Sequence, residues 1–155
     1  MLNVSLMAYR YYFGYGSNIV IAGMQERCPG AILVGVAELP NNRFLINSQG
    51  VATVVQSPVS KVYGVVWQIT PDHEAVLDDY EDIDLELYER AIAQVNLLNL
   101  PIDSEPVAPI EALIYIATDE LSGIPMDGYL EEIVEAAIGH SFPDYYVQEL
   151  KEWFL

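Results

Sequence analysis

Short apolar runs separated by turn residues dominate the first half of the chain. They lie at residues 11–13, 31–37, 43–47, 51–55 and 62–69. Runs of this length between Gly, Asn, Ser and Pro are typical of a meander of short β-strands, here with turns at 48–50 and 57–58. The run at 62–69 is apolar at nearly every position, which predicts a strand that is covered on both faces.

Three helices are predicted after residue 69. Thr70 suits an N-cap and Pro71 the first helical position, and the acidic turn that follows favours a helix ending at about Asp79 or Tyr80. In a second helix, over residues 129–138, four apolar residues share one face: Leu130, Ile133, Val134 and Ala137. Pro143 opens the last helix, whose apolar stripe consists of Tyr146, Val147, Leu150 and Phe154. This stripe would pack on the chain's own core or on a second copy, which leaves a homodimer open.

The order of these elements indicates the fold class. Two further strands, at 88–98 and 112–117, lie on either side of a loop over 100–109 that contains three prolines. Strands come first, with helices between and after them, so the class is α+β. Many short strands in one domain favour a closed or strongly curved sheet flanked by helices, with a helical C-terminus. We find no repeat, linker or low-complexity segment, and residues 1–155 are predicted to form a single domain.

Charge and cysteine content narrow the range of partners. The chain carries 6 basic and 23 acidic residues, a formal net charge of −17, which repels phosphate backbones and anionic lipids. We therefore expect neither nucleic-acid nor membrane partners. Cys28, the sole cysteine, cannot form an intramolecular disulfide, which fits a reducing compartment, and we interpret it as a structural or incidental thiol. The N-terminus lacks the basic region of a signal peptide, and no apolar run reaches the length of a membrane span, so we expect a cytoplasmic protein.

The most informative stretch is Tyr12-Phe13-Gly14-Tyr15-Gly16-Ser17-Asn18. It predicts a strand that ends in a tight turn, followed by a short helix with Ser17 or Asn18 as N-cap. Gly14 and Gly16 leave backbone N–H groups unshielded, and consecutive N–H groups beside a helix N-terminus form an anion site. Such a loop would hold a carboxylate or a developing oxyanion. The alternative is an ordinary Gly-x-Gly turn after a strand, which would have a structural role only.

A run of acidic residues from Asp78 to Asp84 lies at the end of the helix that Thr70 opens. A solvated face is the usual meaning of such a run. A calcium loop would need alternating ligands around a central glycine, but no glycine occurs between Gly64 and Gly123. A catalytic carboxylate is the third interpretation, because crowded acids raise the pKa of at least one of them toward neutrality. Composition does not say which acid that would be.

Taken together, these motifs resemble the γ-glutamylcyclotransferase-like (AIG2-like) family. That family has a Tyr-Gly-Ser-Asn loop, a Val-Tyr-Gly-Val strand, a helix ending in Leu-Asp-x-x-Glu, and a tyrosine seven residues after the Glu. The matching segments are Tyr15–Asn18, Val62–Val65, Leu77–Glu81 and Tyr88. Two Pro-Tyr helix starts, at 125–129 and 143–146, extend the resemblance to about residue 150. It implies a compact β-barrel flanked by helices, in agreement with the curved sheet expected from the strands.

The resemblance also implies roles for particular residues. Glu81 takes the position of the family's catalytic Glu, a general acid and base. Substrate contacts are implied for nine residues: Tyr12, Phe13, Gly14, Tyr15, Gly16, Ser17, Asn18, Tyr88 and Tyr146. Asp82 stands where the family usually has Gly, directly after the catalytic Glu. This departure would alter the turn, or raise the pKa of Glu81 through like charge.

The implied function is γ-glutamylcyclotransferase chemistry on a small γ-glutamyl substrate. The α-amino group of the glutamyl unit attacks its own γ-carbonyl, which releases 5-oxoproline and an amine or amino acid. Because the nucleophile is intramolecular, the reaction is expected to need no metal or other cofactor. Two alternatives stay open. One is a ligand-binding or interaction domain without turnover, and the other is an enzyme that uses the same chemistry to make a specialised amine.

Overall fold

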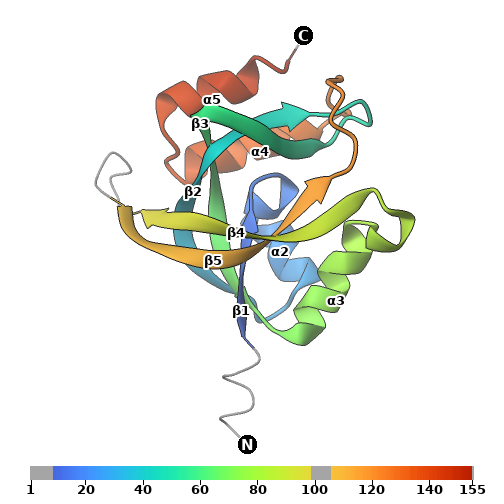
Figure 1. Cartoon of the computed structure of the whole chain (residues 1–155), viewed down its shortest axis with the longest axis vertical. Helices are drawn as coiled ribbons and strands as arrows, with labels where there is room; N and C mark the ends of the chain where they lie inside the picture. Colours follow the sequence, from blue (N-terminus) through green and yellow to red (C-terminus); the bar gives the residue numbers. More distant parts are fainter. Residues whose placement is uncertain (1–8, 99–105, 155) are drawn as a thin grey trace, which may run out of the picture.

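A closed five-stranded barrel forms the body of the protein, as the computed structural model of residues 9–98 and 106–154 shows (Figure 1). The strands follow the order β1-β3-β2-β4-β5 around the barrel, and β1 closes it by pairing antiparallel with β3 and parallel with β5. The strands are β1 (Arg10–Gly14), β2 (Ile32–Ile46), β3 (Ala52–Ile69), β4 (Tyr88–Leu98) and β5 (Pro106–Ala117). The predicted α+β class with a closed barrel is confirmed.

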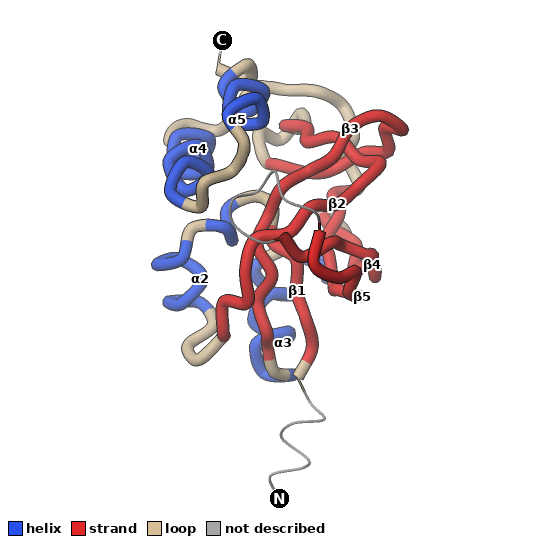
Figure 2. The backbone as a smooth tube through the Cα atoms, turned by 90° about the vertical axis from the view of Figure 1, so that its left-hand side faces the viewer, coloured by secondary structure: helices blue, strands red, loops and turns tan. Residues whose placement is uncertain are grey.

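Helices flank the barrel. They are α2 (Ile21–Arg27), α3 (Pro71–Tyr80), α4 (Tyr129–Gly139) and α5 (Asp144–Lys151), with 3-10 turns η1 (Ser17–Ile19) and η2 (Ile83–Leu85). Figure 2 shows α2, α4 and α5 gathered on one side of the strands. Within the two described ranges, every helix is too short or too polar to span a membrane.

The predicted meander of short strands is wrong in its lengths. The runs at 31–37 and 43–47 belong to the single strand β2, and those at 51–55 and 62–69 belong to β3. The predicted turn at Ser57-Pro58 lies inside β3, where pairing with β2 jumps from Asn42–Gln56 to Pro40–Lys61. Residues 57–60 thus have no partner on β2, and the missing N–H of Pro58 costs no ladder hydrogen bond. Such bulges bend the long strands, which lets the sheet close.

The predicted loop over 100–109 is also too long. Its last residues, from Pro106, already belong to β5, which pairs with β4 as far as Leu98–Pro106. The part of this loop at 100–105 lies outside the described residues. Proline is tolerated here because the first residue of a strand need not donate to the ladder.

The helix predictions after residue 69 are confirmed. Thr70 caps α3 by accepting from the N–H of His73, and the His73 ring accepts from the N–H of Thr70 in return. The predicted apolar face of α4 is buried, as are Tyr146, Val147 and Leu150 of α5. The α5 stripe packs on the chain's own core, where the Tyr146 ring lies 5.1 Å from that of Tyr63. Phe154 lies beyond the end of α5 and is exposed.

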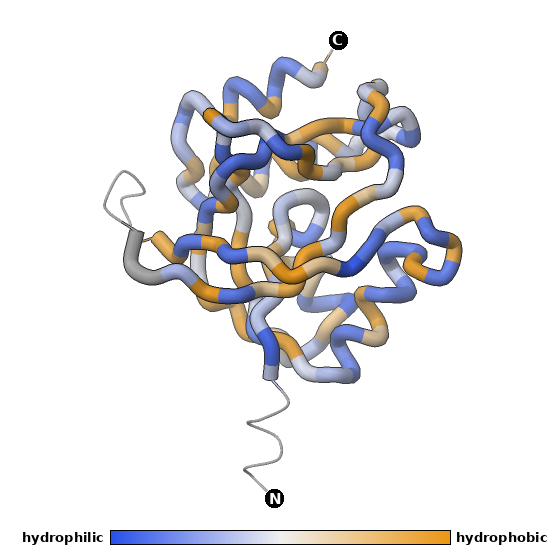
Figure 3. Tube along the Cα trace, in the orientation of Figure 1, coloured by the Kyte–Doolittle hydropathy of each residue, from blue (hydrophilic) through white to orange (hydrophobic). Residues whose placement is uncertain are grey.

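The core sits inside the barrel and under the helices, and hydrophobic residues continue along the strands through the middle of the molecule (Figure 3). Residues 62–69 are buried apart from half-buried Gln68, as their apolar pattern predicted. Gly64 is needed where β3 runs beside the end of β1, because a Cβ there would lie 2.3 Å from the carbonyl oxygen of Gly14 and 2.6 Å from the Phe13 ring. The close approach of these strands places the loop after β1 against the core.

Candidate active site

The loop between β1 and α2 is held in place by the side chain of Asn18, which is buried. Its Nδ2 donates to the Tyr12 hydroxyl at 2.9 Å, its Oδ1 accepts from Arg27, and its carbonyl accepts from the Trp67 indole at 3.0 Å. Ser17 instead shares a hydrogen bond of 2.9 Å with the Tyr80 hydroxyl. These polar side chains tie the loop to the strands and helices around it.

The predicted capping role of Ser17 and Asn18 is wrong. They belong to η1, which precedes α2, and the N-cap of α2 is Val20 without a side-chain capping bond. Both side chains are engaged in tertiary hydrogen bonds, which a local pattern does not reveal. The predicted order of strand, tight turn and short helical segment is nevertheless present.

Free backbone N–H groups line this loop. Among the described residues, the N–H groups of Gly16, Ser17 and Asn18 have no hydrogen-bond partner. Gly16 has φ −110°, so glycine is not needed here for a left-handed backbone. It is needed for space, because a Cβ would approach both the Cβ of Ala52 and the hydroxyl of Tyr129 to 3.2 Å. The loop therefore carries three consecutive backbone donors that no acceptor among the described residues takes up.

Glu81 is the member of the acidic run that turns inward. It forms the C-cap of α3, with its N–H bonded to the carbonyl of Leu77 at 2.8 Å, and it is half-buried. Asp79, Asp82 and Asp84 are exposed, as the solvated-face interpretation predicts for most of the run. Across the described residues, no group of three or more His, Cys, Asp or Glu side chains is placed to hold a metal ion, so the calcium interpretation gains no support.

Asp82 has a left-handed backbone, with φ 53° and ψ 46°. Glycine adopts this conformation at no steric cost, while Asp is among the few other residues that tolerate it. The position after Glu81 thus needs a left-handed residue, and Asp82 keeps the turn that a glycine would form. Of the two effects expected from this departure, the structure supports like charge, because Asp82 raises the pKa of Glu81.

Burial is the largest influence on Glu81 and, with a smaller contribution from Asp82, raises its pKa from 4.5 to about 7. The positive charge of Arg27 opposes both effects. A carboxyl group with a pKa near 7 exchanges protons readily at neutral pH, which is the property required of a general acid and base.

Five tyrosines surround Glu81. They line a cavity of about 30 Å³ and are Tyr12, Tyr15, Tyr88, Tyr115 and Tyr129; the other lining residues are Gly16, Ser17, Asn18 and Ala52. Burial raises the pKa of each tyrosine, so their hydroxyls are neutral at physiological pH. The wall around the carboxylate is thus aromatic, with uncharged hydroxyl groups.

Hydrogen bonds fix these tyrosines to the barrel. Tyr88 donates to the carbonyl of Ala52 at 2.6 Å, and the Tyr129 hydroxyl accepts from the N–H of Ala52 at 3.0 Å. Tyr15 donates to the carbonyl of Tyr115 at 2.5 Å, and Tyr115 donates to Asp78 at 2.6 Å. The cavity is therefore assembled from β1, the loop after it, the start of β3, β4, β5 and the first residue of α4.

The spacing Leu-Asp-x-x-Glu has a structural reason. Leu77 is fully buried, and Asp78 accepts hydrogen bonds from Tyr115 and, at 2.9 Å, from Arg90 on β4. Leu77 and Asp78 precede Glu81 by four and three positions, and residues at these spacings lie on the same side of a helix. Because Leu77 and Asp78 face the barrel, Glu81 faces it as well. Asp78 thus anchors the end of α3, which leaves Glu81 as the acidic residue that faces the cavity.

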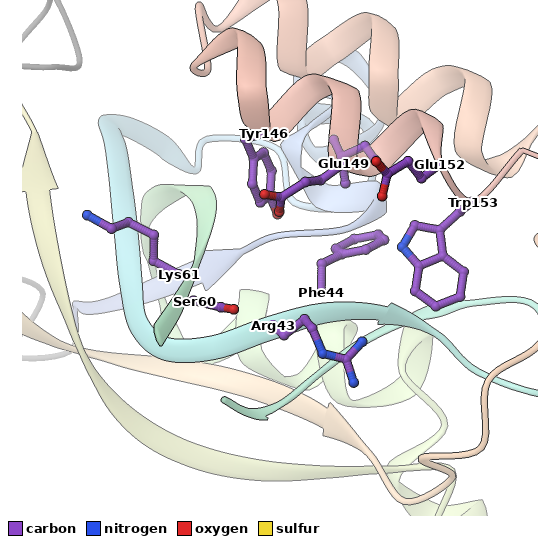
Figure 4. A pocket seen from close by; sticks show the side chains of 9 residues that line it. Arg43, Phe44, Ser60, Lys61, Tyr146, Glu149, Glu152 and Trp153 are labelled. Atoms are coloured by element: carbon purple, nitrogen blue, oxygen red, sulfur yellow. The ribbon is translucent and has the colours of Figure 1, made fainter. Parts of the chain in front are cut away.

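The structure brings together most of the residues predicted for the site. Phe13 and Gly14 do not line the cavity, and Phe13 instead packs inside the barrel against the site of Gly64. Tyr146 lies at a separate groove of about 590 Å³ between α5 and the β2–β3 strands, with Phe44 and Trp153 (Figure 4). The sequence prediction missed Tyr115 and Tyr129. Tyr129 carried a signal, because it ends the first of the two Pro-Tyr helix starts.

The chain is similar to proteins of a known family. The profile of the AIG2-like family matches residues 61–150, and the chain belongs to this γ-glutamylcyclotransferase-related family. The mouse protein named gamma-glutamylcyclotransferase is 26% identical over 150 residues, which cover 90% of this chain and 76% of the mouse protein. The human protein of the same name is 28% identical over the same coverage.

Solved structures agree with this assignment. A gamma-glutamyl cyclotransferase superposes with a TM-score of 0.80 at 27% identity, over 92% of this chain and 86% of that one. A human protein described as uncharacterized superposes with a TM-score of 0.79 at 28% identity, over 93% and 87% of the two chains. A yeast cyclotransferase specific to glutathione has a TM-score of 0.62 at 16% identity and shows the shared fold alone, over 94% of this chain and 95% of that one.

Proposed function

We propose that this protein is a γ-glutamylcyclotransferase that acts on a small γ-glutamyl substrate. The observation that carries the proposal is the Glu81 carboxylate, which lines the cavity and whose pKa is raised to about 7 beside the free N–H groups of the loop. The relatives that carry this name point to the same reaction.

In the proposed reaction a bond forms between the substrate's α-nitrogen and its γ-carbonyl carbon, and the amide bond to the leaving amine breaks. Glu81 takes a proton from the α-ammonium group and delivers it to the leaving nitrogen, so no water, metal or redox partner is consumed. Intramolecular attack needs little orientation beyond folding the glutamyl chain back on itself. General acid–base catalysis of this kind is typically worth 10²–10⁴-fold in rate.

The loop supplies hydrogen-bond donors to an anionic oxygen. The N–H groups of Gly16, Ser17 and Asn18 suit either the α-carboxylate of the substrate or the oxyanion that develops at the γ-carbonyl. The neutral tyrosines exclude water and lower the local dielectric, which strengthens these hydrogen bonds. A cavity of about 30 Å³ has room for little more than water, so binding of a glutamyl group requires lining side chains to move outward.

Release of 5-oxoproline from a panel of γ-glutamyl compounds tests the proposal. The panel contains γ-glutamyl amino acids, a γ-glutamyl peptide such as glutathione, and γ-glutamyl derivatives of simple amines. We expect turnover of at least one compound by the wild-type protein and loss of turnover in Glu81→Gln. The preferred leaving group separates an amino-acid-releasing enzyme from one that makes a specialised amine. Binding of these compounds without any 5-oxoproline would instead identify a ligand-binding domain.

A further inference from the structure

Arg27 is the last residue of α2. Its side chain lies between the loop that carries Asn18 and the end of α3 that carries Tyr80 and Glu81. Its Nη2 donates to Oδ1 of Asn18, the residue that holds the loop. Its guanidinium also lies over the ring of Tyr80, 4.1 Å from the ring centroid, and Tyr80 directly precedes Glu81. One side chain therefore contacts both the donor loop and the end of the helix that presents the carboxylate.

Arg27 also supplies a positive charge that no nearby carboxylate neutralises. Among the six cations, Arg10 and Arg90 pair with Glu74, and Lys61 pairs with Glu38. Among the described residues Arg27 has no ion pair within 4.0 Å, and its buried Nε has no hydrogen-bond partner.

The two remaining cations lie elsewhere. Arg43 lines the groove with Tyr146, and Lys151 lies at the end of α5. In the part of the chain that the structure describes, Arg27 is thus the one cation that borders the Glu81 cavity through direct contacts.

We propose that Arg27 is a positioning residue of this site, which joins the loop at Asn18 to the end of α3 at Tyr80 and places a positive charge beside the Glu81 cavity. The catalytic part of this inference rests on the proposed function. The effect of Arg27 on the Glu81 carboxylate does not, because it is present in the protein without substrate. Arg27 acts through Asn18, Tyr80 and Glu81 and has no reacting atom of its own.

Charged and titratable groups reach Glu81 from every element around it. They are Asp82 in the following turn, Arg27 on α2, Tyr12 on β1, Tyr15 in the loop, Tyr80 on α3, Tyr88 on β4, Tyr115 on β5 and Tyr129 on α4. Burial keeps Tyr12, Tyr15, Tyr88, Tyr115 and Tyr129 neutral, and Asp82 raises the pKa of Glu81. Arg27 alone in this set lowers the pKa of Glu81, so its removal leaves burial and Asp82 unopposed.

The pKa of Glu81 in the substrate-free protein provides the first test, by NMR titration of side-chain-labelled glutamate with Glu81→Gln to assign the signal. We expect Arg27→Gln to raise the midpoint by on the order of one pH unit. Arg43→Gln removes the same charge from the exposed Arg43 of β2 and should leave the midpoint unchanged. Equal midpoints in wild type and Arg27→Gln would overturn the inference. This titration needs no turnover, so it separates failure of the inference from failure of the proposed function.

The second test is the pH dependence of kcat/KM for 5-oxoproline release. A one-unit shift lowers the ionised fraction of Glu81 roughly fivefold at pH 7 and hardly at all at pH 9, so the loss in Arg27→Gln should shrink as the pH rises. Arg27→Lys keeps the charge but not the planar group that contacts Asn18 and Tyr80, so its midpoint should stay near that of wild type while its rate falls. If Arg27→Gln does not fold, Arg27→Met replaces it. A loss that is the same at every pH in Arg27→Gln, or in the Arg27→Met that replaces it, would overturn the inference.

Discussion

Replacing Glu81 by Gln should stabilise the folded protein at neutral and alkaline pH. In the folded state the carboxyl group holds its proton to about pH 7, while in the unfolded chain it releases the proton near its ordinary value of 4.5. Between these values the folded state binds more protons, so the free energy of unfolding falls as the pH rises. A shift from 4.5 to about 7, at 1.36 kcal/mol per unit, corresponds to an upper limit of about 3 kcal/mol above pH 7.

Gln removes this cost because it resembles the neutral acid in size and cannot ionise. Thermal unfolding followed by circular dichroism at a series of pH values measures the difference. Above pH 7 we expect Tm to be raised by up to roughly 6–12 °C, from about 2–4 °C per kcal/mol for a domain of this size. Below pH 4.5 the two proteins should unfold at the same temperature, because Glu81 is then protonated in both states.

Asp79→Asn is the matched control, since it removes the same charge from the exposed neighbour Asp79 at the end of α3. We expect it to change Tm little at any pH, and to keep 5-oxoproline release close to that of wild type. Glu81→Gln should be more stable and yet at least about a hundredfold slower, as expected when a general acid–base group is lost. If Glu81→Gln shows no pH-dependent gain in stability, the carboxylate is not desolvated. If it retains near-normal turnover while Asp78→Asn or Asp79→Asn does not, Glu81 is not the proton carrier.

Three further predictions concern the loop, the close approach of β3 to β1, and the reaction conditions. Gly16→Val should weaken 5-oxoproline binding about tenfold in calorimetry with little change in Tm, because a larger side chain would crowd Ala52 and the Tyr129 hydroxyl; unchanged affinity would make the loop a structural turn only. Gly64→Ala should lower the free energy of unfolding measured in urea by about 1–3 kcal/mol, because its Cβ would lie 2.3 Å from the Gly14 carbonyl oxygen. Gly139→Ala is the control and should not destabilise the fold, because no atom lies within 4 Å of its Cβ. Equal effects of the two substitutions would contradict the close approach. Turnover should rise from pH 6 to 9 with a midpoint near the Glu81 pKa of about 7 and should be indifferent to chelator; a steady fall over this range, or loss of activity on chelation with recovery in zinc or calcium, would refute the mechanism.

The sequence by itself determined the features that depend on near neighbours along the chain. The capping residue Thr70, the proline after it and the apolar face of α4 predicted the helices, because capping and helical periodicity involve residues within about four positions. The continuous apolar run at 62–69 predicted a strand buried on both faces, because this pattern too is carried by adjacent residues. Glu81 was predicted only through the resemblance of Leu77–Glu81 to the Leu-Asp-x-x-Glu motif of the family, because the residues alone did not say which acid of the run it would be.

The tertiary structure decided which distant segments meet. Strand β3 continues through a bulge at Pro58, which looked like a turn, because the missing N–H falls where no partner on β2 requires it. Ser17 and Asn18 use their side chains across the fold instead of capping a helix, since Tyr80 and Tyr12 lie within hydrogen-bond reach only when the barrel is closed. Closure also brings Tyr115, Tyr129 and Arg27 to Glu81 and places Tyr146 at another groove. The pKa of Glu81 depends on this assembly, because burial and the charge of Arg27 exist only once the elements have packed around the carboxylate.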